Sequence, residues 1–144
     1  MREILFRGKR VKPVALVSQW ILGNYVFKAD NSLPGLGKHF IVVHDGFGLS
    51  QWVEVDPATV GQFTGLTDKH GTKIFEGDIV HMNSKKFELS GHGVVIYRNG
   101  GFAIDDRKRN RIYPFMQNGQ YNAGDYRVDG NIHDHKELLH DSKV

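Results

Sequence analysis

The stretch Val60–Val80, VGQFTGLTDKHGTKIFEGDIV, decides the fold of this chain. Asp68 and Gly71 stand at the first and last positions of a predicted type I turn. Gly77 predicts a second sharp reversal, because glycine adopts a positive φ without steric cost. Each turn leads into a short segment of strand-forming residues. These two predicted strands are Lys73–Phe75 and Asp78–Met82.

Similar short segments recur along the whole chain, separated by glycine, asparagine or aspartate. No segment longer than about two turns shows helical periodicity. Many short strands joined by glycine-rich turns predict an all-β protein. We expect short antiparallel strands that form a barrel-like or folded-over sheet, with an SH3-like C-terminal part. The other predicted strands are Glu3–Arg7, Val14–Ile21, Tyr25–Lys28, Phe40–Val43, Leu49–Val55, Val60–Thr64, Gly93–Tyr97, Phe102–Ile104, Arg111–Tyr113 and Tyr126–Ile132.

Hairpin turns are predicted where a dipeptide that tolerates positive φ separates two apolar segments. Asn99-Gly100 is the clearest case, and Gly23-Asn24 is a second one. The turns between Gly65 and Gly71 mark a boundary inside a single domain. We therefore expect two subdomains, residues 1–65 and 66–144.

One or two short helices are predicted, both from capping residues. Asp56-Pro57 resembles an N-cap followed by proline at the first helical position, which predicts one turn through Thr59. Asp134 and Glu137 have the spacing of a capping box, which predicts a short C-terminal helix.

Composition places the chain among ordinary globular proteins. It has 144 residues, 40% hydrophobic and 24% charged, with a formal net charge of +3. The absence of cysteine excludes disulfides and a cysteine nucleophile, and it fits a reducing cytoplasm. No apolar run approaches the roughly 20 residues that span a bilayer. We expect a soluble protein that has no membrane partner.

Five groups of residues along the chain carry a resemblance to a known family: Met1–Gly8; Trp20, Gly23 and Tyr25; Gly61–Leu66, Asp68, Gly71 and Ile74–Val80; Gly93-Val94, Tyr97 and Gly101-Phe102; Val128, Gly130–Asp134 and Glu137–Leu139. Together they resemble the YopX family, whose members are small proteins carried mostly by phages and prophages of Gram-positive bacteria. The resemblance implies a mostly-β, barrel-like fold and a phage or prophage setting, and it supplies no catalytic residues. Where relatives often have asparagine and proline, this chain has His135-Lys136. The phage or prophage setting also implies the cytoplasm of a bacterial host cell.

The residues that could carry chemistry favour a structural interpretation. Glu76 and Asp78 flank a glycine, and we expect Asp78 to accept backbone hydrogen bonds at that turn rather than to bind a metal. His133 and His135 form the tightest histidine group, but surface or turn positions explain them more simply than a metal site. No serine lies in a Gly-x-Ser-x-Gly elbow. We therefore predict no catalytic residues, no metal, no cofactor and no enzymatic activity.

The basic features give the best indication of a partner. Four cations lie within five positions and a tyrosine follows, an arrangement that suits single-stranded nucleic acid because phosphates pair with charge and bases stack on rings. A solvated β-turn is the simpler alternative, since Asp105 and Asp106 precede the run. The candidate binding residues are Arg107, Lys108, Arg109, Arg111 and Tyr113.

Two functional hypotheses follow. The first is a non-enzymatic accessory or assembly protein that binds itself, as a homo-oligomer, or another protein, because sheet edges can be satisfied by pairing. The second is a single-stranded nucleic-acid-binding module that uses the stretch Arg107–Tyr113.

Overall fold

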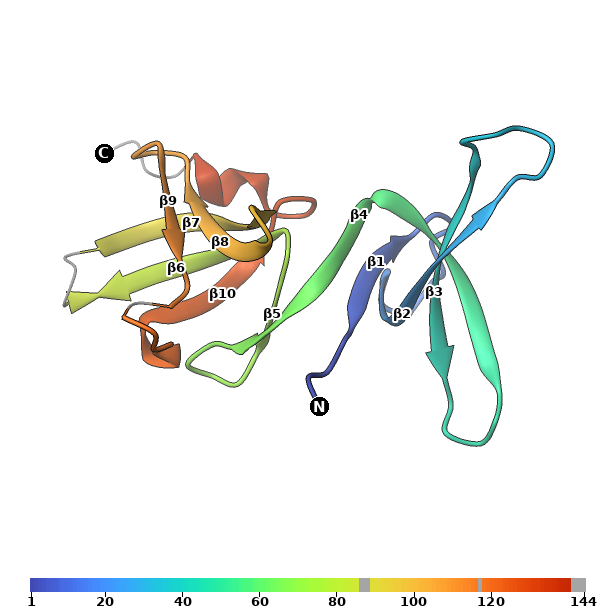
Figure 1. Cartoon of the computed structure of the whole chain (residues 1–144), viewed down its shortest axis with the longest axis horizontal. Helices are drawn as coiled ribbons and strands as arrows, with labels where there is room; N and C mark the ends of the chain where they lie inside the picture. Colours follow the sequence, from blue (N-terminus) through green and yellow to red (C-terminus); the bar gives the residue numbers. More distant parts are fainter. Residues whose placement is uncertain (86–88, 117, 141–144) are drawn as a thin grey trace. The chain divides into compact units, whose positions relative to one another are not determined.

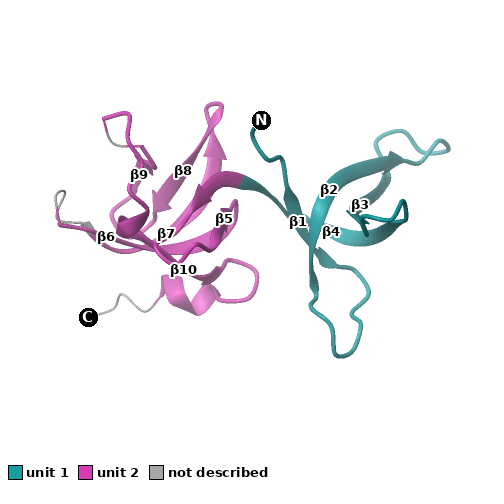
Figure 2. Cartoon of the chain, turned by 90° about the horizontal axis from the view of Figure 1, so that it is seen from below, with its two compact units in different colours: residues 1–63 teal, residues 64–144 magenta. Residues whose placement is uncertain are grey.

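The computed structural model describes residues 1–85, 89–116 and 118–140, and within them the chain is all-β (Figure 1). Its strands form two five-stranded antiparallel sheets, and its helical segments are 3-10 turns rather than α-helices. The all-β prediction is thus confirmed. No helix in this part of the chain is long and apolar enough to span a bilayer. The chain divides into two compact units, Met1–Phe63 and Thr64–Val144 (Figure 2).

Unit 1 is built around a ring of four strands. In the first sheet β1 pairs with β2, β2 with β3 and β3 with β4, and β4 returns to pair with β1. Phe6 of β1 consequently lies opposite both Gly23 of β2 and Gln62 of β4. The bounds are β1 Phe6–Arg10, β2 Trp20–Ala29, β3 Gly37–His44 and β4 Ser50–Thr67. The buried apolar side chains are Ile41, Val42, Val53, Val55 and Phe63.

Unit 2 contains the second sheet, in the order β10-β6-β7-β8-β9. Four consecutive strands form a meander, and the last strand lies beside the first after a 3-10 turn, which is the expected SH3-like arrangement. The elements are β5 Lys73–Phe75, β6 Asp78–Ser84, β7 Leu89–Arg98, β8 Gly101–Asp106, β9 Arg111–Pro114, η2 Ala123–Asp125, β10 Tyr126–Asn131 and η3 Lys136–Leu139. The main core cluster is Ile74, Val80, Met82, Val95, Ile104, Phe115 and Tyr126.

Three of the turns predicted from local chemistry are present, at Gly71, Gly77 and Asn99-Gly100. The Gly71 N–H donates to the Asp68 carbonyl at 3.0 Å, and Gly71 has a φ of +79°. Asp78 accepts the Phe75 N–H through Oδ2 at 2.8 Å, as expected for the turn at Gly77. Asn99 and the following glycine both have positive φ, as a type I′ hairpin between β7 and β8 requires.

The prediction for the second hairpin was wrong. Residues 11–18 form an exposed loop instead of a strand, and β2 runs through Gly23-Asn24 without a turn. Gly23 serves a different purpose, because a Cβ at this position would lie 2.3 Å from the Val42 carbonyl oxygen. The glycine therefore permits close approach between β2 and β3 rather than a reversal of the chain.

The predicted helical turn at Asp56 was also wrong, because these residues lie inside β4. Asp56 does accept the Ala58 N–H through Oδ1, at 3.0 Å. Thr59 Oγ1 donates to the Asp56 carbonyl and accepts the Lys9 N–H, at the point where the pairing of β1 with β4 shifts register. The capping chemistry therefore shapes a bulge against β1, which the sequence alone could not reveal.

The C-terminal helix exists as the single 3-10 turn η3, and its N-cap lies one residue after the predicted Asp134. The N-cap residue of η3 is His135, and its side chain makes no capping hydrogen bond. Asn131 caps the turn that precedes η3, because its Oδ1 accepts the N–H groups of His133 and Asp134, both at 3.0 Å.

Candidate functional site

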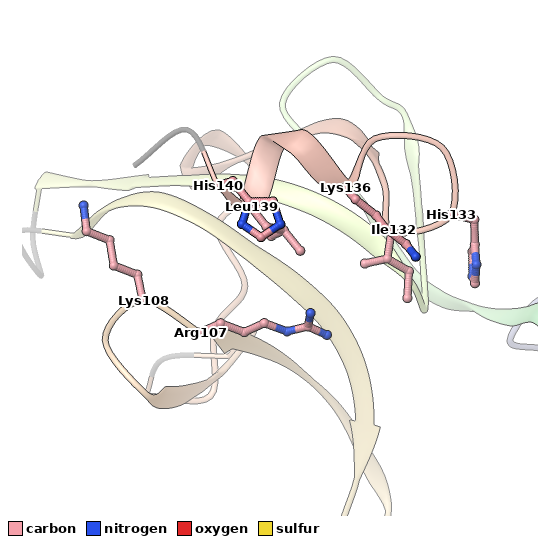
Figure 3. A pocket seen from close by; sticks show the side chains of 7 residues that line it. All are labelled: Arg107, Lys108, Ile132, His133, Lys136, Leu139 and His140. Atoms are coloured by element: carbon pink, nitrogen blue, oxygen red, sulfur yellow. The ribbon is translucent and has the colours of Figure 1, made fainter. Parts of the chain in front are cut away.

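A basic pocket lies in unit 2 between the β8–β9 turn and the C-terminal segment (Figure 3). Its volume is about 600 Å³. Three of the seven lining residues are Arg or Lys, two are His and two are aliphatic, and none is Asp or Glu. We call it the basic pocket, lined by Arg107, Lys108, Ile132, His133, Lys136, Leu139 and His140.

The β8–β9 turn is held by a buried carboxylate. Asp106 is fully buried and accepts the Arg109 backbone N–H at 3.1 Å and its Nη1 at 2.7 Å. Arg109 Nη2 also donates to the Ser90 carbonyl of β7. The hydrogen bond that Arg109 donates to Asp106 raises the pKa of Arg109 above its ordinary value. Arg109 therefore ties the turn to the sheet, and this fixed turn presents the exposed Arg107 and Lys108.

The other wall of the pocket is fixed by backbone hydrogen bonds. The Ile132 N–H donates to the Gly77 carbonyl at 2.9 Å, which joins the C-terminal segment to the turn of the opening stretch. Ile132 and Leu139 are half-buried, whereas Lys136 is exposed. In Figure 3 the side chain of Arg107 extends toward the segment that carries Ile132 and Lys136, and the ammonium of Lys108 points the other way.

The structure separates the five predicted nucleic-acid-binding residues. Arg107 and Lys108 line the basic pocket, and Arg109 is committed to Asp106. Arg111 is exposed at the start of β9 and does not line the pocket. Tyr113 packs against the core cluster, and its buried hydroxyl has no hydrogen-bond partner within the described residues. The ring is therefore partly covered by the core rather than fully exposed beside the cations.

The two histidines of the His133–His135 group have different surroundings. His133 lines the basic pocket, whereas His135 Nδ1 accepts the Asn131 N–H at 3.2 Å. A Cβ at Gly130 would lie 2.5 Å from the same nitrogen of His135, so that ring packs closely on the backbone of β10. Across residues 1–85, 89–116 and 118–140, no group of three or more histidine, aspartate or glutamate side chains could hold a metal ion.

A charged cluster on the face of the second sheet was missed by sequence reasoning. His92 Nε2 and Asp129 Oδ2 are 2.7 Å apart, and Arg127 Nε donates to Asp129 Oδ1 at 2.6 Å. The Arg127 hydrogen bond, with a further contribution from His92, lowers the pKa of Asp129 to about 2 although burial opposes this. Burial lowers the pKa of His81, which lies opposite His92. Only the register of β10, β6 and β7 brings these residues together, and no local pattern encodes that register.

Comparison with known proteins adds an independent observation. The family model described as YopX protein matches residues 35–140. The chain belongs to the YopX family. This match includes both the opening stretch and the C-terminal motif, so the resemblance noted from the sequence is confirmed. A comparison with curated proteins gives no significant match.

Two solved structures are similar over nearly the whole chain. Protein EF1440 from Enterococcus faecalis is 26% identical, with a TM-score of 0.53, and the match covers 96% of this chain and 99% of that one. Protein yopX from Bacillus subtilis is 16% identical, also with a TM-score of 0.53, over 96% and 98% of the two chains. The second likeness shows a shared fold. YopX membership assigns no activity to the chain.

Proposed function

We propose that this YopX family protein is a non-enzymatic accessory protein of a phage or prophage, which acts in the bacterial cytoplasm by assembling with a second copy of itself. The proposal rests on the uneven distribution of exposed apolar side chains between the two units. Thirteen of the sixteen large apolar side chains exposed in the described residues belong to unit 1. Among the described residues, unit 1 buries five apolar side chains and unit 2 buries ten.

Unit 1, which spans Met1–Phe63, is also small for a unit with its own hydrophobic core. A domain of about 60 residues already buries only about 60% of the surface that its unfolded chain exposes. Exposed apolar groups that gather on one unit favour association, because each square ångström removed from water contributes about 25 cal/mol. The exposed apolar residues of unit 1 are Met1, Ile4, Val11, Val14, Leu16, Val17, Leu22, Phe27, Leu33, Leu36, Phe47, Leu49 and Trp52.

A second copy of the chain is the partner that best fits this need. A surface that must be covered for stability requires a partner that is present wherever the chain is made, and symmetric self-association meets that requirement. Because β1 pairs with both β2 and β4, the strands β1–β4 close on one another. The contact would therefore be made by side chains rather than by pairing of sheet edges.

The loop between β3 and β4 presents two of these side chains on a hydrogen-bonded turn. Phe47 is 92% exposed and Leu49 is 72% exposed. The loop is nevertheless ordered, because Asp45 Oδ1 accepts the N–H groups of Phe47 and Leu49 at 2.7 and 3.1 Å. An aromatic side chain on a preordered turn loses little entropy on binding, which is a property of interface hot spots.

Light scattering on the purified full chain at micromolar concentrations tests the proposal. We expect a dimer or larger assembly for the wild type. The variant Phe47→Ser/Leu49→Ser should dissociate at a concentration about tenfold higher or more. The matched control Ile112→Ser/Met116→Ser removes exposed apolar groups from unit 2 and should assemble like the wild type. A wild type that stays monomeric throughout would refute the proposal.

The single-strand hypothesis stays a prediction, and the geometry favours it less. Two of its five residues have other roles, since Arg109 is bound to Asp106 and Tyr113 packs on the core. The exposed cations Arg107 and Lys108 belong to a pocket rather than to an open strand-binding surface.

A further inference from the structure

We propose that the basic pocket binds a nucleoside phosphate. Arg107 and Lys136 hold the phosphate, and the apolar side chains of Ile132 and Leu139 contact the nucleoside. This site is in unit 2, and the proposal is independent of the assembly proposed for unit 1.

The charge of the pocket selects an anion. Cationic and imidazole side chains make up five of the seven lining residues, and no carboxylate lines the pocket to oppose them. Such a one-signed concave surface concentrates ligands of the opposite charge. The pocket combines residues from the β8–β9 turn with residues between positions 132 and 140. Hydrogen bonds fix both walls, one to the Ser90 carbonyl of β7 and the other to the Gly77 carbonyl of the β5–β6 turn.

Two cations in the pocket are well placed to contact phosphate. Asp105 Oδ2 lies 3.6 Å from Arg107 Nε, and the Arg107 side chain is still 57% exposed. Lys136 forms no ion pair with any of the residues that the structure describes, and Figure 3 shows its ammonium on the side toward which Arg107 extends. Guanidinium binds phosphate oxygens in a bidentate manner, while lysine adds a point charge.

The size and the apolar lining of the basic pocket indicate a ligand larger than a free phosphate ion. A volume of about 600 Å³ lies within the range that accommodates an organic molecule of nucleotide size. Ile132 and Leu139 supply an aliphatic surface next to the cations, against which a base or a sugar can pack. A nucleoside phosphate carries both an anionic group for the cations and an organic group for the aliphatic surface.

A nucleoside phosphate can reach the pocket from two sources, a free mononucleotide or the 5′-phosphorylated end of a nucleic-acid strand. A smaller cavity of about 130 Å³ shares Arg107, Lys108 and Leu139 with the basic pocket. It is also lined by His92, by Arg109 and by Asp106, the carboxylate to which Arg109 is bound. The next phosphate of a strand could occupy this neighbouring cavity, whereas a free mononucleotide would need the basic pocket alone.

Calorimetric titration of the full chain at low salt tests the proposal with AMP, adenosine and inorganic phosphate as probes. We expect AMP to bind at least about tenfold more tightly than adenosine, because a charge-assisted hydrogen bond contributes about a factor of ten or more. AMP should also bind more tightly than inorganic phosphate, because only AMP contacts Ile132 and Leu139. Equal binding of AMP and adenosine, or of AMP and inorganic phosphate, would overturn the assignment.

Two variants with the same change in net charge locate the binding site. Arg107→Gln/Lys136→Gln should weaken AMP binding by about tenfold or more. Arg98→Gln/Arg111→Gln alters exposed cations that do not line the pocket and should change the affinity by less than about twofold. Circular dichroism checks that both variants fold. If both variants bound AMP like the wild type, the pocket would not be the site.

Oligonucleotides then distinguish the two sources. A 5′-phosphorylated oligonucleotide is compared with a 5′-hydroxyl oligonucleotide one nucleotide longer, so that both carry the same number of phosphates. Tighter binding of the phosphorylated strand, lost in Arg107→Gln/Lys136→Gln, supports recognition of a strand end. Tight binding of AMP with no preference between the strands supports a free mononucleotide.

Discussion

Asp68 Oδ2 accepts the backbone N–H of Val128, 60 residues further along the chain, at 2.8 Å. The other carboxylate oxygen, Oδ1, accepts the N–H groups of His70 and Thr72 within the turn, both at 2.9 Å. Asp68 is 3% exposed. One buried carboxylate therefore closes the turn of the opening stretch and joins it to β10. This bond links the two sequence motifs that carry the family resemblance.

The variant Asp68→Asn should destabilise the protein by about 1–3 kcal/mol. An amide keeps one acceptor for the turn but replaces the second oxygen with a donor, which leaves the Val128 N–H facing another N–H group. Urea denaturation measures the loss in free energy of unfolding.

Asp45→Asn is the matched control for this prediction. Asp45 Oδ1 likewise accepts two turn N–H groups, but Asp45 is exposed and makes no comparable bond to a distant strand. We expect a change of less than about 0.5 kcal/mol. An equal loss in the two variants would show that the bond to Val128 contributes nothing.

Stability should fall in acid because of Asp129. Its pKa of about 2 in the folded protein lies below the ordinary value of 3.8. A lowered pKa contributes stability at pH values above about 4, and this contribution is lost as the pH falls through about 2. Its size is about 2 kcal/mol, since Asp129 is mostly buried. The pKa of Asp68 is also lowered, because its three backbone hydrogen bonds outweigh the effect of burial, so it adds to the same loss.

Comparison of Asp129→Asn with the wild type by urea denaturation from pH 7 to pH 2 isolates this contribution. The variant should be less stable at pH 7, and the difference should narrow toward pH 2. Asp30→Asn makes the same charge change at an exposed residue and should follow the wild-type profile. If the difference in free energy of unfolding between the wild type and Asp129→Asn stayed constant with pH, the lowered pKa of Asp129 would not contribute to stability.

Local turn chemistry explains most of what could be predicted from the sequence. The hairpin at Asn99-Gly100 and the turns at Gly71 and Gly77 depend on backbone angles that glycine and asparagine adopt readily. Asp78 was assigned a hydrogen-bonding role at its turn because short acids accept nearby N–H groups, and it has that role. These features depend on residues only a few positions apart.

Features that depend on distant pairing could not be predicted. Asp56-Pro57 has the local pattern of a helix start, but pairing with β1 draws these residues into the 18-residue strand β4. The bond from Val128 to Asp68 and the meeting of Arg107 with Lys136 at one pocket likewise depend on the register of β6 and β10. The cationic run Arg107–Arg111 could be recognised in the sequence, but the residues of the C-terminal segment that lie beside it could not.

Gly93→Ala should destabilise unit 2 by about 1–3 kcal/mol, because it overfills a packed core. A Cβ at Gly93 would lie 2.3 Å from Ile104 Cγ2 and 3.2 Å from Met82 Cε. Gly101→Ala is the control, since a Cβ there meets nothing within 4 Å. Thermal unfolding should show a lower Tm for Gly93→Ala alone, and an unchanged Tm would mean that the core relaxes around the added methyl group.

Tyr113→Phe should leave stability unchanged or raise it by about 1 kcal/mol. The Tyr113 hydroxyl is buried without a hydrogen-bond partner in the described part of the chain, while the ring packs against the core cluster. Removal of an unsatisfied buried hydroxyl relieves a desolvation penalty of about 1–3 kcal/mol, and the ring contacts are retained. Tyr113→Ala should instead lower the free energy of unfolding by about 3 kcal/mol or more, because a large cavity is left. If Tyr113 instead stacked on bases, Tyr113→Ala would weaken the binding of single-stranded oligonucleotides, and the free energy of unfolding would equal that of the wild type. That result would contradict the structural role.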